Sequence, residues 1–231
     1  MPKMEPTQWT KIRSGDADYL VSRYWDPVHR FLRSRLPKGA PAEDLTQDLF
    51  LRFIQKNIAD RADPEKGSFR NFLFHIARQF LYDTLRKRKN ILDAAATLES
   101  FDADEEATDP KKVFEAEWYR ELVHRARRRV KAFYLEKEQP ERYLAFRLFY
   151  FGSEEAGHWN QNRISEELKV PVHQVNNYVA RARQRYAEEI RALVSEYCAD
   201  EKAVELELEH LTSFLSEQSP SGKVDLSSLA N

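Results

Sequence analysis

The residues best suited to binding chemistry lie in one stretch, residues 67–90, which joins an apolar seam to a dense basic end. The basic end consists of four consecutive cations, Arg86, Lys87, Arg88 and Lys89. Guanidinium and ammonium groups neutralise nucleic-acid phosphates, and aromatic rings stack on unpaired bases. Cations also favour helix C-termini, so a core helix with a solvated basic end fits the same residues. The stretch by itself leaves both interpretations open.

The element that must position these cations is a helix. Apolar residues recur in the stretch at the three-to-four-residue spacing of one helix face. They are Phe69, Phe72, Leu73, Ile76, Phe80 and Leu81. Elsewhere, the six glycines lie between or outside apolar-periodic stretches, and strand-like alternation bounded by hairpin turns is absent. The sequence therefore predicts an all-α fold.

Apolar spacing, together with prolines at expected helix starts, gives a set of predicted helices. They span residues 16–24, 27–35, 41–57, 68–88, 110–135, 140–150, 161–168 and 172–197, followed by an acidic amphipathic helix with Val204, Leu208, Leu211 and Leu215. The seam of the 110–135 helix is formed by Phe114, Trp118, Leu122, Ala126, Val130 and Phe133. We expect residues 219–231 to be disordered.

The charge pattern suggests two small domains. Net charge is −1, but residues 102–109 are rich in acids and residues 125–131 are rich in cations. We expect an N-terminal domain at 1–90, an acidic linker at 91–109 and a second domain at 110–197. An acidic helix and tail at 198–231 complete the chain.

Several function classes fit the sequence poorly. No apolar run approaches the length of a membrane span, the N-terminus lacks a signal-peptide core, and there is one cysteine. We therefore expect a cytoplasmic protein. No glycine-rich phosphate loop occurs, and no histidine pair has metal-ligand spacing. We expect no enzymatic activity, no cofactor and no metal.

A helix-turn-helix pattern lies near the C-terminus. Its apolar positions are Ile164, Leu168, Val170, Val172, Val175 and Val179. The outer face of its second helix carries His173, Gln174, Asn176, Asn177, Arg181 and Arg185. Amides and guanidinium groups can bind adenine and guanine edges bidentately in a major groove. An ordinary helical hairpin with a polar solvent face is the alternative.

An acidic face is predicted on the helix at 41–57. Glu43 and Asp44 fall in its first turn, where acids interact favourably with the helix dipole. That explanation does not extend to Gln47 and Asp48, one turn further along. The helix therefore carries a plausible docking face for a basic partner.

Taken together, these motifs resemble a known family. Residues 42–52 (AEDLTQDLFLR) are similar to region 2.1–2.2 of bacterial sigma factors of the extracytoplasmic-function (ECF) group. Residues 69–78 (FRNFLFHIAR), followed by Asp83 and residues 85–88, are similar to region 2.3–2.4, and residues 172–185 to the recognition helix of region 4. The chain departs from the family pattern at Phe72, where tryptophan is usual, and at Lys169 and Pro171, where glycine and serine are usual.

The resemblance implies two partners, core RNA polymerase and promoter DNA. The residues implied for docking on the clamp helices of the polymerase β′ subunit are Glu43, Asp44, Gln47 and Asp48. For the −10 element they are Arg78 and Gln79 at the opened strand and Arg86, Lys87 and Arg88 at phosphates, with the loop at 60–66 accommodating an unstacked base. For the −35 element they are Gln174, Asn176, Asn177, Arg181 and Arg185.

Alternatives to a sigma factor remain at this point. One is a helix-turn-helix regulator that never joins polymerase, which would leave the acidic face unexplained. Another is a sigma-like adaptor that has lost promoter recognition. Regulation by an anti-sigma protein or a kinase is also left open by the sequence.

Overall fold

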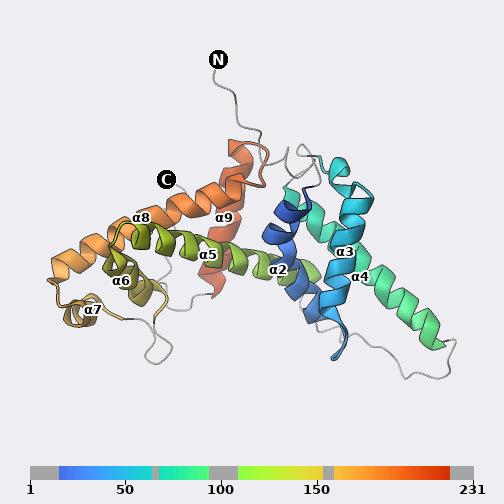
Figure 1. Cartoon of the computed structure of the whole chain (residues 1–231), viewed down its shortest axis with the longest axis horizontal. Coiled ribbons are helices and arrows are strands. Elements are labelled where there is room, and N and C mark those ends of the chain that lie inside the picture. The colour runs from blue at the N-terminus through green and yellow to red at the C-terminus, as the bar shows by residue number, and fades with distance from the viewer. Residues whose placement is uncertain (1–15, 64–67, 94–108, 153–158, 219–231) are drawn as a thin grey trace, which may run out of the picture. The chain divides into compact units, whose positions relative to one another are not determined.

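The computed structural model describes residues 16–63, 68–93, 109–152 and 159–218 (Figure 1). Within these ranges the chain forms eight α-helices, one 3-10 helix and no strand, which confirms the predicted all-α fold. The chain divides into two compact units. Unit 1 comprises residues 1–121 together with Glu196–Ala199, and unit 2 comprises Leu122–Ser195 and residues 200–231.

Unit 1 is built around four elements that follow one another along the chain. They are α2 (Ala17–Arg35), α3 (Ala42–Gln55), the 3-10 helix η1 (Ile58–Arg61) and α4 (Phe69–Asp93), and the first part of α5 (Pro110–Glu136) joins them. Their fully buried large side chains are Leu20, Phe31, Leu32, Leu49, Phe53, Phe69, Leu73 and Phe114. This aromatic-rich core is what holds the exposed faces of α3 and α4 in place.

The first helix differs from its prediction. Two helices were predicted, ending at residue 24 and restarting at Pro27, but α2 runs unbroken and contains Pro27. Proline lacks the N–H that would donate to the carbonyl of Arg23. An interior proline costs a helix about 3 kcal/mol or more. The buried side chains of Tyr24, Pro27 and Val28 keep one apolar stripe in register across the proline. Tertiary packing therefore outweighs the local penalty.

The end of α3 was also predicted too late. The helix stops at Gln55 because Asn57 adopts a left-handed conformation with φ of 46°, a geometry that asparagine tolerates. The chain then forms η1, which was not predicted, and Ala59 buries its methyl group. This short turn positions the residues that precede α4.

The beginning of α5 completes the core of unit 1. The ring of Phe114 lies 5.5 Å from that of Phe31 and 5.3 Å from that of Phe74, measured between centroids. Trp118 stacks on Tyr24 at 5.4 Å. The predicted seam of this helix is confirmed, since its members are buried except Phe133, which is half-buried.

A buried ion pair joins α4 to α5. Arg70, 2% exposed as a residue, places its Nη1 2.7 Å from a carboxylate oxygen of Glu115. Its guanidinium also lies 5.2 Å from the ring centroid of Tyr119. A buried cation is tolerated only when it is paired and hydrogen-bonded, so these contacts fix the start of α4 against α5.

Unit 2 contains the rest of α5 with α6 (Pro140–Tyr150), α7 (Gln161–Leu168), α8 (Val172–Ser195) and α9 (Glu201–Gln218). Helix α8 contacts α6, α7 and α9 and is the centre of the unit. Its buried side chains include Val175, Tyr186 and Ile190. The stripe predicted on α9 is buried at Val204, Leu208 and Leu211 and half-buried at Leu215.

The predicted linker at 91–109 falls almost entirely outside the described residues. Helix α4 continues to Asp93, five residues beyond its predicted end, and the description resumes at Asp109. There the Asp109 carboxylate accepts a hydrogen bond of 2.9 Å from the N–H of Lys111. The two compact units divide inside α5, after Glu121. The predicted domain boundaries thus stay predictions.

Candidate nucleic-acid interface

Helix α3 has one buried side and one acidic side. Thr46, Leu49, Phe50 and Phe53 are buried, and the Thr46 hydroxyl donates to the carbonyl of Ala42 at 2.7 Å. The side chains predicted for docking are exposed, namely Glu43, Asp44, Gln47 and Asp48. Within the described part of the chain, none of these three acids forms an ion pair, so their charge is available to a partner.

An apolar residue extends the acidic face. Leu51 is 50% exposed and lies one helical turn beyond Gln47 and Asp48. The sequence analysis did not assign it a role, although its spacing from Asp44 and Asp48 would have placed it on this face. The acids supply a charge that can steer association with a partner, and the exposed leucine supplies apolar area that a partner can bury.

Helix α4 has a basic and aromatic exposed face. Its buried side includes four members of the predicted seam, Phe69, Leu73, Phe80 and Leu81, while Phe72 and Ile76 are half-buried. The opposite side exposes His75, Arg78, Gln79, Tyr82 and Arg86 at helical spacing, with Lys87 adjacent. The side chain of Arg88 lies outside the described part.

Tyr82 is the aromatic residue of this face that the sequence analysis missed. It is 52% exposed, and the Arg78 guanidinium lies 5.4 Å from its ring centroid. An exposed ring next to cations suits stacking on an unpaired base next to its phosphates. Its position four residues after Arg78 and four before Arg86 was the available signal.

A cavity of 360 Å³ opens beside the same helix, within unit 1. It is lined by Arg61, Asp63, Ser68, Asn71, Phe72, Phe74, His75 and Lys111. Rings can stack on a base, the Asn71 amide can bond a base edge, and the basic groups can meet phosphates. Two of its lining residues, Arg61 and Asp63, come from the loop at 60–66, whose residues 64–66 lie outside the described part.

Helices α7 and α8 pack against each other across a short turn, as the helix-turn-helix pattern predicted. The Asn160 side chain caps α7 by accepting a 2.9 Å hydrogen bond from the N–H of Arg163. Lys169 ends α7 in a left-handed conformation with φ of 54°, and the Ser165 hydroxyl donates to the carbonyl of Val170 at 2.5 Å. Val172, predicted in the apolar seam, is 37% exposed instead.

The residues predicted for −35 recognition fall into two groups on α8. Asn176, Asn177 and Arg181 are exposed. Gln174 is half-buried, and its amide donates to the Tyr178 hydroxyl at 2.5 Å. Within the described ranges, the side chains of the first group form no hydrogen bond or ion pair, whereas the amide of Gln174 is already hydrogen-bonded within the helix.

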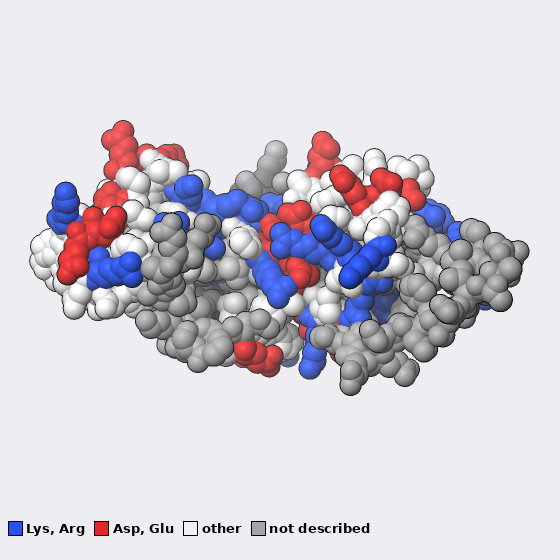
Figure 2. Space-filling model, turned by 90° about the horizontal axis from the view of Figure 1, so that it is seen from below, with Lys and Arg blue, Asp and Glu red and all other residues white. Residues whose placement is uncertain are grey.

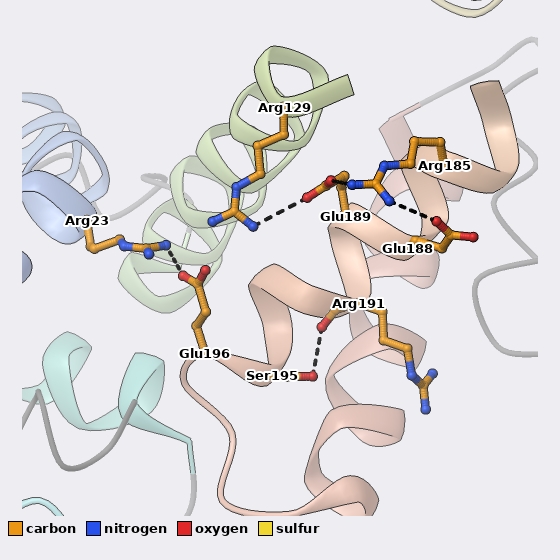
Figure 3. A network of polar contacts seen from close by, with 8 residues as sticks. All are labelled: Arg23, Arg129, Arg185, Glu188, Glu189, Arg191, Ser195 and Glu196. Carbon is orange, nitrogen blue, oxygen red and sulfur yellow. Dashed lines mark hydrogen bonds and ion pairs between the residues drawn. The ribbon is translucent and has the colours of Figure 1, made fainter. Parts of the chain in front are cut away.

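Arg185 belongs with Gln174, because its guanidinium is held within unit 2 (Figure 3). It pairs with Glu188 at 3.3 Å and with Glu189, and it lies 4.4 Å from the ring centroid of Phe133. Glu189 also pairs with Arg129 of α5 at 3.4 Å. Arg185 therefore fixes α8 against α5 in this structure.

Charges on one face of the molecule are mixed rather than segregated. On the face drawn in Figure 2, acidic side chains lie among basic ones. Arg191, for example, pairs with Glu201 and Glu205 of α9, and these hydrogen bonds raise the pKa of the Arg191 guanidinium. Nucleic-acid binding must then depend on local groups and not on a uniform basic field.

Two tyrosines are buried in unit 2, Tyr134 of α5 and Tyr186 of α8. Burial raises the pKa of Tyr134, and the positive charges of Arg142, Arg181 and Arg185 oppose the shift. Burial also raises the pKa of Tyr186, whose hydroxyl has no hydrogen-bond partner within the described residues. Both phenols therefore stay neutral at physiological pH and serve as core.

The exposed acids of α3 and the basic, aromatic face of α4 lie in one stretch of sequence, and that stretch has a counterpart among known families. Residues 20–91 match the family model for Sigma-70 region 2. The chain contains a Sigma-70 region 2 domain. No curated protein and no solved structure matches the chain.

This region 2 domain comprises most of α2, all of α3 and η1, and α4 up to its last turn. It therefore includes both exposed faces and most of the lining of the cavity. Lys111, at the cavity's far side, lies beyond the matched residues. No described helix has the length and apolar character needed to span a membrane, and no group of three metal-ligating side chains occurs among the described residues.

Proposed function

We propose that the protein is a sigma factor of the ECF group, which binds core RNA polymerase and directs promoter recognition and opening. The observation that carries this proposal is the Sigma-70 region 2 match, because it covers the helices that bear the acidic face and the basic face. The rest of the proposal follows from what those faces can bind.

Docking on polymerase is assigned to α3. Exposed carboxylates that form no ion pair with any described residue attract a basic partner, and Leu51 supplies apolar area beside them. A helix-turn-helix regulator that never meets polymerase would have no use for this face.

Binding of the −10 element is assigned to α4 and the adjacent cavity. Arg78, Gln79 and Tyr82 face the opened strand, and Arg86, Lys87 and Arg88 bind phosphates. The cavity accommodates one unstacked base between Phe72 and the polar groups of its lining. The exposed ring of Tyr82 beside the cations of α4 fits a strand that is held by its backbone and recognised by its bases.

Recognition of the −35 element is assigned to α8. Asn176, Asn177 and Arg181 present two amides and one guanidinium on an exposed helical surface. These groups suit adenine and guanine edges in a major groove. Gln174 and Arg185 already have contacts within unit 2, so we assign them to holding α8 in place and not to reading bases.

The decisive experiment is run-off transcription with purified core RNA polymerase and the full chain. We expect co-purification with core and transcripts that start downstream of a defined promoter. A chain that binds DNA but never core would be a helix-turn-helix regulator. A chain that binds core but yields no transcript from any promoter of a genomic library would be an adaptor.

Neutralising the basic end of α4 should change the salt dependence of promoter opening. Replacing Arg86, Lys87 and Arg88 by alanine removes three phosphate contacts. We expect the plot of log K against log salt to become shallower by roughly two to three, at about 0.7–0.9 per contact. Permanganate footprinting of −10 melting over a salt series measures it. The control replaces Arg33, Lys38 and Lys56, three exposed cations of the same unit, and should leave the slope unchanged.

Removing the amide of Asn177 should relax sequence preference at one −35 position. A bidentate amide–adenine contact is worth about 1–3 kcal/mol of discrimination, so the preferred base should lose roughly a factor of ten. Selection from randomised −35 sequences, with Asn177→Ala and Asn176→Ala holoenzymes, measures the change. Gln184→Ala, on the same helix, is the control. If both asparagine variants select the wild-type consensus, Asn176 and Asn177 are solvent-exposed side chains that do not contact bases.

A further inference from the structure

The cavity beside α4 is completed by a residue from outside the region 2 match. Seven of its eight lining residues lie between Arg61 and His75. The eighth is Lys111, which lies in the first turn of α5 and beyond the matched residues 20–91. The cavity therefore includes a part of unit 1 that the family match leaves without a role.

Lys111 is placed beside the cavity by the packing of α5 on α4. Phe114, one turn further along α5, is fully buried, and its ring centroid lies 5.3 Å from that of Phe74, which also lines the cavity. Glu115 accepts a hydrogen bond of 2.7 Å from Arg70 of α4. All these residues belong to unit 1, so these contacts fix the backbone of Lys111 relative to the rest of the lining.

The start of α5 does not by itself account for a lysine at position 111. Asp109 caps this helix end by accepting a hydrogen bond of 2.9 Å from the N–H of Lys111. Cations in the first turn meet the positive end of the helix dipole, which is unfavourable. Lys111 and Lys112 both lie in this turn, and of the two only Lys111 lines the cavity. The cavity supplies a reason for a cation at 111 that the helix does not.

Lys111 also decides the formal charge of the cavity lining. Arg61 and Lys111 carry positive charges and Asp63 carries a negative one, so with histidine counted as neutral the lining has a charge of +1. Without Lys111 the charge would be zero. A phosphate at the cavity would then meet as much formal repulsion as attraction, whereas Lys111 makes the balance attractive.

The ammonium group of Lys111 can exchange its present contact for an anion. Its side chain is 55% exposed, and its Nζ lies 3.9 Å from a carboxylate oxygen of Glu115. The same carboxylate has a closer partner in Arg70, at 2.7 Å. Exposed ion pairs contribute little stability, so giving up the longer contact is inexpensive. A lysine ammonium is a compact charge on a flexible stem, which suits binding to a phosphate at the rim of a cavity.

We propose that Lys111 binds a backbone phosphate of the nucleotide whose base enters the cavity. The inference rests on the proposed function, because it takes the −10 strand as the occupant. Residues of α4 receive the base, and Lys111 of α5 holds the phosphate, which positions the nucleotide without reading its sequence. The first turn of α5 is thus part of the −10 site, and capture of the strand depends on α5 as well as on α4.

The contact is measured with the full chain bound to core RNA polymerase. The probe is a fluorescein-labelled single strand that carries the −10 element of a promoter found by run-off transcription, and fluorescence anisotropy gives K over a salt series. Lys111→Ala should lower the affinity roughly fivefold to tenfold and make the plot of log K against log salt shallower by about 0.7, the value for one contact to a single strand.

The neighbouring lysine provides a matched control. Lys112 is exposed in the same helical turn but does not line the cavity, so Lys112→Ala should change neither the affinity nor the slope. Lys111→Arg keeps the charge and should retain wild-type binding. Urea unfolding midpoints should be equal for the two alanine variants, because neither side chain belongs to the core.

Neutral linkages in the probe separate direct contact from an indirect effect. Replacing one phosphate at a time by an uncharged methylphosphonate should reveal one position at which the wild-type protein loses as much affinity as it does on Lys111→Ala. At that position the methylphosphonate should cost the Lys111→Ala protein nothing further, since the contact is already absent. The Lys112→Ala protein should lose as much as the wild type.

The outcomes distinguish the two levels of the proposal. Equal methylphosphonate costs at every position in the wild-type and Lys111→Ala proteins would overturn the assignment of Lys111 and leave the proposed function standing. A loss of affinity that Lys112→Ala shares would overturn the assignment too. A wild-type holoenzyme that binds the −10 strand no better than a scrambled strand would instead count against the proposed function, and the assignment would fall with it.

Discussion

Replacing Asp44 and Asp48 by arginine is expected to abolish binding to core RNA polymerase. Both carboxylates are exposed on the face of α3 that also carries Leu51, and neither has an internal ion pair among the described residues. Reversing a charge at an interface both removes an attraction and creates a repulsion, and each effect is worth about 2–5 kcal/mol when the pair is desolvated. Affinity should therefore fall by more than about a thousandfold.

Fluorescence anisotropy with labelled chain and purified core measures this loss. Asp18→Arg with Asp26→Arg is a matched control, since both are exposed acids of α2 in the same unit. Circular dichroism should give the same helix content for all three proteins. Wild-type affinity in the Asp44/Asp48 variant would contradict docking through α3.

Truncating Phe114 is expected to destabilise unit 1 by about 3–5 kcal/mol, the usual cost of a buried Phe→Ala change. Its ring is fully buried and contacts Phe31, Phe74 and Trp118. The contact with Phe74 matters for function, because Phe74 lies beside the cavity on α4. Loss of promoter opening should accompany loss of stability.

Urea unfolding followed by circular dichroism measures the free-energy change. Leu135→Ala, on the same helix but 51% exposed, is the control and should change stability by less than about 0.5 kcal/mol. Unit 1 of the Phe114→Ala protein should unfold at lower urea than unit 2. A free-energy change similar to the control would mean that α5 does not complete this core.

Most of the fold could be predicted from the sequence because helical seams are a local signal. Most members of the seams predicted for α4 and α5 are buried, from Phe69 to Val130, whereas Phe72 and Ile76 are half-buried. The break predicted at Pro27 was wrong, since packing on both sides of the proline maintains the helix. The contribution of residues 196–199 to unit 1 had no local signal, because it arises from contacts across more than a hundred residues of sequence.

The candidate site was predictable only in part. Helical spacing placed Asp44, Asp48 and Asn177 on exposed faces, where the structure has them. It did not separate these from Arg185, although Glu188 and Glu189, which pair with Arg185, lie three and four residues further along the same helix, a spacing that was readable from the sequence. The cavity beside α4 forms where three segments meet, namely residues 61–63, residues 68–75 and Lys111. No single stretch of sequence therefore predicts it.

Two cations in the unit 2 part of α5 have partners within that unit. Arg129 is paired with Glu189, and the Arg127 guanidinium lies 4.2 Å from the ring centroid of Phe151. Charges already compensated in this way would release few counterions on contact with duplex DNA, so these two arginines would add little affinity for random sequence. For the sigma factor proposed above, weak binding to random sequence would favour binding to polymerase before binding to promoter DNA.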